Sequence, residues 1–207
     1  TVTTEVFANL HYLALARCPD FMLLSECYTQ WDANRVTYGL DNIPGYSAQQ
    51  LATPKGVHFV AGKVVTLVRD GVLWQPVDFT SKWNAAVDAR IERLDISRAA
   101  EVVLRKELLK SKVYALCTRI LDLSGNKTLL INIYRPQNGG ETGDGCTMEH
   151  LAAFLEELLG GAECVGHRVL IGGDFNAHHL SWSYKTNRLG SELLEWCDRA
   201  GFQVLND

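Results

Sequence analysis

The longest apolar run in this chain, Thr128–Tyr134, has only the length of a β-strand. A helix that spans a membrane needs about 20 apolar residues, and no run approaches that length. The 207 residues are 47% hydrophobic and 21% charged, which is the composition of a soluble globular protein with one sizeable core. The chain therefore has to fold from short strands and amphipathic helices, and we expect a single domain over residues 1–207 without a membrane span.

The order of periodic and apolar segments predicts a mixed architecture. Segments with a helical period are 5–17, 83–112, 147–159 and 190–199, and the second is expected to break near 95–97, where Ser97 can cap its second half. Segments of strand type are 20–26, 57–60, 63–69, 113–119, 127–134, 168–174 and 202–205, whereas 28–56 is expected to be loop. Residues 72–74 are expected to continue the pairing of 63–69 after a tight turn. Paired strands with helices between some of them predict an α/β sandwich with mixed, largely antiparallel sheets.

The net charge of -4 and the six scattered cysteines argue against some classes of protein function. Proteins that bind nucleic acid tightly and without preference carry a basic surplus, because phosphate contacts dominate their affinity. The charge argues against that class but permits an enzyme whose basic residues line one groove. No C-x-x-C pair is present, which argues against a zinc knuckle. Residues 1–5 have no secretory pattern, so we expect a reducing, intracellular compartment.

The segment 172–179, Gly-Gly-Asp-Phe-Asn-Ala-His-His, carries the most specific chemical signal. An apolar strand delivers Asp174 at its end and Asn176 follows two residues later, so both side chains leave an extended backbone on the same side. They can converge on one phosphate or one metal ion, and the glycines before them let a ligand or another backbone approach closely. A buried strand that ends in a polar turn explains the same residues, and the pattern alone leaves both interpretations open.

Two further polar residues end apolar strands. A carboxylate at Glu26, after Leu-Leu-Ser, is costly unless it meets a cation or hydrogen-bond donors, and Mg²⁺ binds few protein carboxylates together with several waters. Tyr134 leaves its strand before an Arg-Pro pair, and its phenol can donate to the charge that develops on a phosphate. Taken alone, each has a better structural explanation: Glu26 as a solvated glutamate and Tyr134 as an aromatic ring packed on the core.

Together these segments resemble the endonuclease/exonuclease/phosphatase superfamily, which includes DNase I-like nucleases, abasic-site endonucleases and the endonucleases of non-LTR retrotransposons. The resemblance covers most of the chain, from 23–26 to 205–206. The Gly-Asp-Phe-Asn motif is quite specific. Its extension by Ala-His-His, Trp182 and Asn-Arg-Leu-Gly at 187–190 resembles the non-LTR branch, as does Ile-Tyr-Arg-Pro at 133–136. The resemblance implies a DNase I-like four-layer α/β sandwich.

The resemblance also implies a role for each residue that matches a family motif. Glu26 looks like the metal-binding glutamate, and Asp174 looks like the carboxylate that orients or deprotonates the attacking water and lies at the metal. Asn176 resembles the amide that holds the phosphate, and Tyr134 resembles the tyrosine that contacts it. The implied cofactor is Mg²⁺, with Mn²⁺ as an alternative. The residues expected to contact DNA are Arg135, His178, His179, Asn187 and Arg188.

Several features depart from the family pattern. Ser25 stands where the family usually has Gln, and Asn9, inside a helical pattern, is a poor substitute for the asparagine of the family's first strand. The Ser-Asp-His motif of the family does not occur in the sequence, so we expect a domain that is incomplete at both ends and feebly active at most. Residues 83–112 form a longer helical insert than the family leads us to expect. The histidine pair at 178–179 also suggests a zinc site as a weaker alternative.

The expected function is metal-dependent nicking of DNA, in which the exposed 3'-hydroxyl primes retroelement insertion. This resemblance implies DNA as a partner, a reverse transcriptase in the same polypeptide and action in the nucleus. Two alternatives stay open. The chain can belong to another branch of the superfamily, such as abasic-site repair endonucleases or phosphoinositide and sphingolipid phosphatases. It can also be a non-catalytic remnant or interaction module that kept the fold.

Overall fold

The computed structural model describes residues 4–25, 43–50, 64–77, 79–110, 114–121, 125–135, 147–160 and 164–205. The chain divides into two compact units. One, which we call the sheet unit, comprises Thr1–Phe79, Tyr114–Tyr134 and Gly166–Gly173. The other, the helical unit, comprises Thr80–Val113, Arg135–Val165 and Asp174–Asp207. Each unit is described by itself below.

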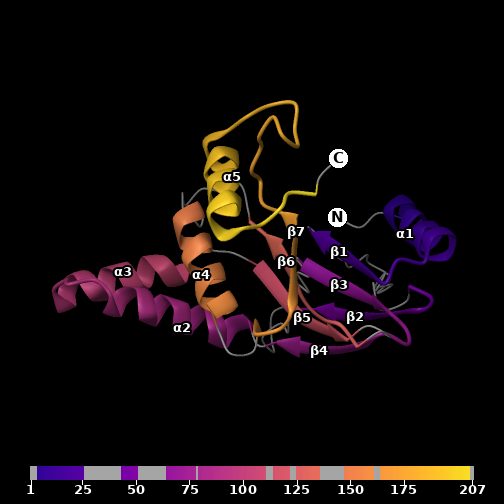
Figure 1. The fold of residues 1–207 in the computed structure, drawn as a ribbon, viewed down its shortest axis with the longest axis horizontal. Helices are drawn as coiled ribbons and strands as arrows, with labels where there is room; N and C mark the ends of the chain where they lie inside the picture. Colours follow the sequence, from indigo (N-terminus) through magenta and orange to yellow (C-terminus); the bar gives the residue numbers. More distant parts are fainter. Residues whose placement is uncertain are drawn as a thin grey trace, which may run out of the picture. The chain divides into compact units, whose positions relative to one another are not determined.

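The sheet unit contains two sheets (Figure 1). The first has the order β1-β3-β2, and both of its strand pairs are antiparallel. The second has the order β4-β5-β6-β7, with antiparallel β4–β5 and β5–β6 pairs. The strands of the first sheet are β1 (Phe21–Ser25), β2 (Tyr46–Gln50) and β3 (Val64–Arg69). Those of the second are β4 (Leu73–Val77), β5 (Tyr114–Leu121), β6 (Lys127–Tyr134) and β7 (Arg168–Asp174).

Strands β6 and β7 run parallel, which makes the second sheet mixed. They are hydrogen-bonded neighbours, and Gly173 near the end of β7 lies against the backbone of Ile133 near the end of β6. The C-terminal ends of the two strands therefore lie next to each other, and because the strands are neighbours in the sheet, they run in the same direction. The sheets are therefore mixed and largely antiparallel, as predicted.

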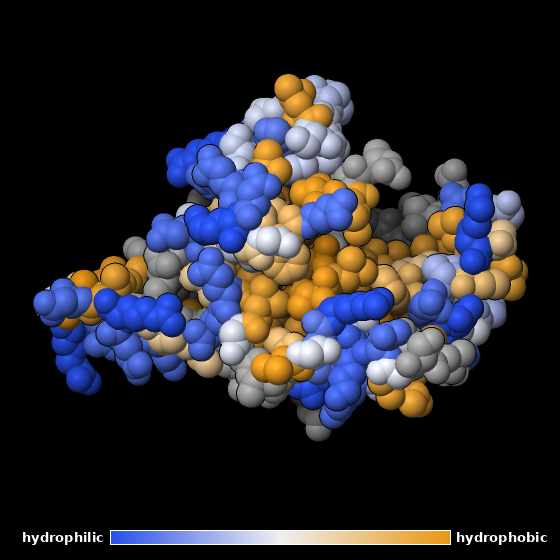
Figure 2. All heavy atoms as spheres, in the orientation of Figure 1, coloured by the Kyte–Doolittle hydropathy of each residue, from blue (hydrophilic) through white to orange (hydrophobic). Residues whose placement is uncertain are grey.

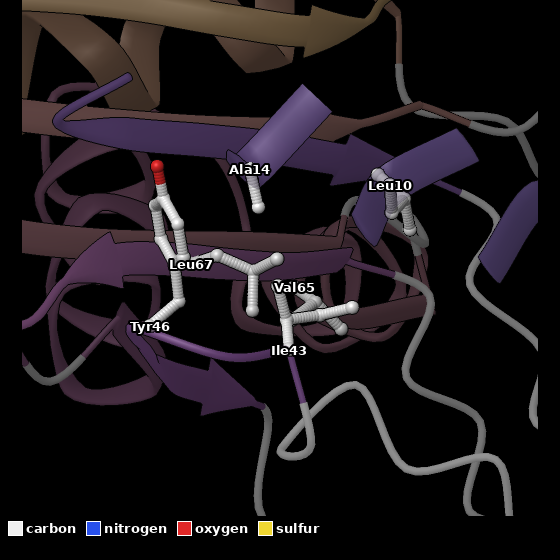
Figure 3. Close-up of a cluster of buried hydrophobic side chains, with 6 residues drawn as sticks. All are labelled: Leu10, Ala14, Ile43, Tyr46, Val65 and Leu67. Carbon is white, nitrogen blue, oxygen red and sulfur yellow. The ribbon is translucent and has the colours of Figure 1, made fainter. Parts of the chain in front are cut away.

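Strand β3 is the centre of the core because it is buried on both faces. Its residues from Val64 to Val68 are all buried, and successive side chains of a strand point to opposite faces. Val65 and Leu67 pack against helix α1 (Thr4–Arg17), in a cluster with Leu10 and Ala14 of α1 (Figure 3). The alternate residue Val64 packs instead with residues of the second sheet.

Buried polar side chains join the two sheets. The Asn132 amide of β6 donates 2.9 Å to the Val65 carbonyl and 3.4 Å to Thr66 Oγ1. Gln49 of β2 donates 3.2 Å to the Cys117 carbonyl of β5 and accepts a hydrogen bond from the Thr118 hydroxyl. Buried polar groups are costly unless paired, so these bonds favour one register of the two sheets over alternatives that would leave the amides unpaired.

The helical unit contains α2 (Phe79–Glu92), α3 (Arg98–Lys110), α4 (Met148–Gly160) and α5 (Arg188–Ala200). The predicted break between α2 and α3 is confirmed, and the Ser97 hydroxyl accepts from the Ala100 amide at 3.4 Å. Arg105 pairs with Asp88 across the two helices. Helices α4 and α5 lie side by side (Figure 1). That α2 and α3 form an insert in the family fold stays a prediction, as does the single domain.

Three sequence-based assignments were wrong. Tyr46–Gln50, expected to be loop, is strand β2: its buried Gln49 faces the other sheet, so a polar residue on the buried face hides the apolar alternation. Residues 72–74 were expected to pair with β3, but Leu73 begins β4, which pairs with β5 of the second sheet. Residues 202–205 form no strand, because Phe202 turns back after Gly201 and stacks on Trp196 at 5.2 Å.

The remaining expectations for the described elements hold. The α/β class and all four helical segments are confirmed, and so are strands at the predicted places in 20–26, 63–69, 113–119, 127–134 and 168–174. The strand expected at 57–60 lies outside the described residues. Within the part of the chain that the structure describes, no helix has the length and apolarity to cross a membrane.

Candidate active site

Asp174 and Asn176 form a tight turn at the end of β7. The Asn176 amide nitrogen donates 2.9 Å to Oδ1 of Asp174. Asn176 has a φ of 50°, in the left-handed region, which asparagine tolerates better than most residues. The residue types of the motif are therefore partly fixed by the turn, because a carboxylate accepts its bond and an asparagine adopts its backbone angle.

Two hydrogen bonds join the turn to the chain segment that follows β6. The Arg135 amide donates 2.8 Å to the Asp174 carbonyl, and the side-chain amide of Asn176 donates 2.7 Å to the Arg135 carbonyl. Arg135 thus holds the turn from two sides through its backbone. The Asn176 amide plane is fixed in orientation, which is the pre-organisation that a group binding a phosphate needs.

The glycines before Asp174 permit a close approach of other parts of the chain. A Cβ on Gly173 would lie 2.0 Å from the Ile133 carbonyl oxygen, and the Gly173 φ is 122°. A Cβ on Gly172 would lie 2.6 Å from a methyl carbon of Leu23. The sequence left open whether a ligand or another backbone comes close, and at Gly173 the structure shows the backbone of β6.

Asn187 ties the segment after the motif to helix α5. It is the N-cap of α5, and its Oδ1 accepts from the Gly190 amide at 2.8 Å. The same oxygen accepts from the His178 amide at 3.0 Å, and its Nδ2 donates 3.3 Å to the Asn176 carbonyl. Asn187 was predicted to contact DNA. The structure gives its side chain a positioning role in this segment, and DNA contact stays a prediction.

Gly190 explains the spacing of the Asn-Arg-Leu-Gly motif. A Cβ at this position would lie 1.8 Å from the His178 carbonyl oxygen, and the Asn187 amide donates 2.8 Å to that oxygen. Any residue with a side chain would push the two segments apart. The motif that the sequence identified as a family extension therefore fixes residues 176–178 against the first turn of α5.

The two histidines have neighbours that hold their rings. His179 Nδ1 accepts from the Ser181 amide at 3.2 Å, which places the proton of a neutral ring on Nε2. The His179 ring lies 5.2 Å from the Trp182 ring, and His178 Nδ1 lies 3.4 Å from the Ser183 hydroxyl. Ser181 and Ser183 were not predicted from the sequence, although each lies within five residues of the histidine that it contacts.

Tyr134 and Arg135 are more buried than their predicted roles suggest. Tyr134 is 6% exposed and packs with Val64 and Leu116, which is the structural explanation that the sequence favoured for this residue alone. The Arg135 side chain is fully buried, so a phosphate cannot contact it without a local rearrangement. Phosphate contact by Tyr134 and DNA contact by Arg135 stay predictions, and the burial of Arg135 argues against the second.

Arg188 lies in the first turn of α5 on the exposed surface. Its guanidinium forms an ion pair with Glu192 at 2.6 Å, and the hydrogen bond to Glu192 raises the Arg188 pKa further. The side chain is therefore a permanent cation whose charge is partly compensated by its neighbour. An exposed pair of this kind contributes little to stability.

The expected metal ligands are described only in part. Glu26 lies outside the described residues. Within the described ranges, no three His, Cys, Asp or Glu side chains are grouped in a way that would hold a metal ion. Asp174 offers a hard carboxylate at the end of a strand, and hard oxygen ligands suit Mg²⁺. Binding of Mg²⁺ by Asp174 and Glu26 stays a prediction.

The mixed two-sheet α/β fold thus carries a Gly-Asp-x-Asn turn at the end of a strand. Residues 128–207 match the model of a family described as endonuclease-reverse transcriptase. This match suggests an endonuclease/phosphatase-type domain and supports the resemblance of the chain to the endonuclease/exonuclease/phosphatase superfamily and its non-LTR retrotransposon branch. The DNase I-like α/β class is confirmed with it. No curated protein and no solved structure matches the chain.

Proposed function

We propose that this domain is a Mg²⁺-dependent DNA endonuclease that nicks one strand and thereby primes retroelement insertion. The observation that carries the proposal is the fastened turn of Asp174 and Asn176 at the end of β7, within the segment that matches the endonuclease-reverse transcriptase family. A carboxylate and an amide held two residues apart are the groups that hydrolysis of a phosphodiester requires for water and for phosphate.

The metal would be held by Asp174 together with Glu26, and the ion supplies Lewis-acid polarisation of a phosphoryl oxygen. Asp174 orients the attacking water and accepts its proton. Asn176 holds the phosphate, because its amide plane is already fixed by the hydrogen bond to the Arg135 carbonyl. Preorganised donors cost no reorganisation when charge develops on the phosphate, which is why they contribute strongly to rate.

The retroelement context rests on the matching family, which is described as endonuclease-reverse transcriptase. A nick leaves a 3'-hydroxyl that a polymerase can extend. We therefore propose DNA as the substrate, a reverse transcriptase in the same polypeptide as the partner, and the nucleus as the place of action.

The test is nicking of supercoiled plasmid by this chain and by a longer chain that includes any further residues encoded on either side of it. Each is assayed with Mg²⁺, with Mn²⁺ and with EDTA. We expect nicking that requires Mg²⁺ or Mn²⁺ and that EDTA abolishes. Asp174→Ala should abolish nicking, since sites whose groups act together lose most of their rate when one group is removed.

The matched control is Asp95→Ala, which removes an exposed carboxylate in the link between α2 and α3. It should nick at the wild-type rate. A duplex with one abasic site is included as a second substrate. If only that duplex is cleaved, the repair alternative replaces the retroelement one, and if the longer chain cleaves no DNA with any metal, the endonuclease proposal is wrong.

A further inference from the structure

The segment Leu180–Lys185, which we call the display loop, exposes apolar side chains where a loop normally exposes polar ones. Leu180 is 71% exposed and Tyr184 is 88% exposed. The loop lies between β7 and α5, and apolar atoms stand out at its end among polar neighbours (Figures 1 and 2). Apolar surface gains free energy when a partner covers it, so both side chains are available for contact with one.

The backbone of the display loop is held by its own hydrogen bonds. The His179 carbonyl accepts from the Trp182 and Ser183 amides at 2.9 and 2.8 Å, and the Leu180 amide donates 3.3 Å to the Thr186 hydroxyl. The exposed side chains therefore extend from a backbone whose conformation is fixed. Preorganisation of this kind reduces the entropy lost on binding.

Further hydrogen bonds hold the display loop beside the candidate active site. Trp182 Nε1 donates 3.0 Å to the carbonyl of Ala177, the residue after Asn176. The Asn187 side chain bonds to both Asn176 and His178, which flank that residue. All of these groups belong to the helical unit. A polymer whose phosphate is held at Asn176 therefore has the display loop as its neighbour.

The positive charge of Lys185 in the display loop suits the negatively charged backbone of a nucleic acid. The Lys185 ammonium lies 5.6 Å from the centre of the Tyr184 ring, so an aromatic face and a cation stand together. Along a nucleic acid, a flat base and a phosphate also stand together, and base–aromatic stacking tolerates every base because each has a π-face. An uncharged apolar partner would gain nothing from Lys185.

We propose that the display loop contacts DNA next to the cleaved bond, with Tyr184 stacked on an unpaired or partly unstacked base and Lys185 at an adjacent phosphate. The inference deepens the proposed function, on which its choice of DNA rests. It assigns to this loop a preference for DNA that is distorted or opened beside the nicking site, since a base within a regular duplex offers no free face for stacking.

The test uses oligonucleotides that carry the fluorescent base 2-aminopurine, either single-stranded or in a duplex with a one-base bulge. Binding is followed by anisotropy and stacking by quenching, in EDTA so that no cleavage occurs. The chain of residues 1–207 and the longer chain are both measured. Wild type should quench the bulged base, and Tyr184→Ala should abolish the quenching and weaken binding at least about fivefold.

Tyr184→Phe keeps the ring and should keep the quenching. The matched control is Tyr12→Ala, because Tyr12 is a 69% exposed tyrosine on α1, in the other unit. Since Tyr184 is exposed, its alanine variant should fold normally by circular dichroism. Equal quenching by wild type and Tyr184→Ala overturns the inference, as does a wild type that quenches no oligonucleotide.

The nicking assay separates this inference from the proposed function. If the longer chain nicks plasmid while Tyr184→Ala quenches like wild type, the endonuclease stands and the loop assignment is wrong. If Tyr184-dependent quenching is found but no chain nicks, the loop is a DNA contact of a non-catalytic module, and the endonuclease proposal is the one that fails.

Discussion

The side-chain amide of Asn176 donates a 2.7 Å hydrogen bond to the backbone carbonyl of Arg135. This bond joins the turn that ends β7 to the segment that leaves β6, although the two residues are 41 positions apart in the chain. It makes Asn176 both a structural residue and the proposed phosphate ligand, so its two roles have to be separated by experiment.

Asn176→Ala should destabilise the chain by about 1–3 kcal/mol. The variant loses the bond to Arg135 and places a residue with a Cβ at a φ of 50°. Asn176→Gly loses the same bond without the backbone strain, so it should be more stable than the alanine variant by roughly 1 kcal/mol. Urea unfolding followed by circular dichroism measures both. Equal stabilities would show that the left-handed backbone angle costs the alanine variant no free energy of unfolding. In the nicking assay we expect both variants of the longer chain to be inactive.

Gly173→Ala should prevent normal folding of the sheet unit or cost more than about 3 kcal/mol. The added Cβ would meet the Ile133 carbonyl oxygen at 2.0 Å, and backbone at both sides cannot move without parting β6 from β7. The control is Gly71→Ala, where φ is also positive but nothing lies within 4 Å. It should cost only about 1–2 kcal/mol of backbone strain. Thermal unfolding compares the two, and similar losses would contradict the close approach.

Asn187→Ala should lower the free energy of unfolding by about 1–2 kcal/mol, at the upper end of the effect of losing an N-cap. The larger value is expected because Oδ1 accepts from two amides, those of Gly190 and His178. Ser97→Ala removes the exposed, 3.4 Å cap of α3 and should cost less. Hydrogen exchange provides the specific readout: the His178 and Gly190 amides should exchange faster in Asn187→Ala, and unchanged protection would show that the network is not formed.

The stability of the chain should fall as the pH rises above about 9. Burial raises the pKa of the Cys197 thiol above its ordinary value of 9.0, and the nearby Asp198 raises it further. The unfolded thiol then loses its proton at lower pH than the folded one, so the stabilisation is full below 9.0 and is lost as the pH rises toward the folded pKa. Chemical unfolding between pH 7 and 10 measures this, with Cys197→Ala as the comparison. If the two chains lose stability in parallel, another group is responsible.

Local pattern predicted most of the elements because the helical and strand periods are written into consecutive residues. Helix α5 and its end at Gly201 illustrate this: the apolar positions repeat at the helical period, and the Gly201 φ of 74° provides the left-handed cap that a glycine after a helix indicates. The place of Asp174 at the end of a strand also follows from its own neighbours.

Long-range pairing, in contrast, was decided only in three dimensions. Strand β2 was missed because Gln49 is satisfied by Cys117 and Thr118, which are far away in the chain. The partner of β4 is β5, and no residue near Leu73 specifies whether a strand returns to its own sheet or passes to the next.

The sequence by itself determined the residue types of the candidate site, because Asp174 and Asn176 stand where a strand ends and carry the groups that we propose to bind water and phosphate. Only the tertiary structure decided what holds them and what surrounds them. The Arg135 carbonyl that orients Asn176, the Asn187 amide that fixes the following segment and the burial of Arg135 depend on contacts between segments that lie apart in the chain. Chemistry is a property of single side chains and is visible in the sequence, whereas position is a property of packing and appears only when the chain has folded.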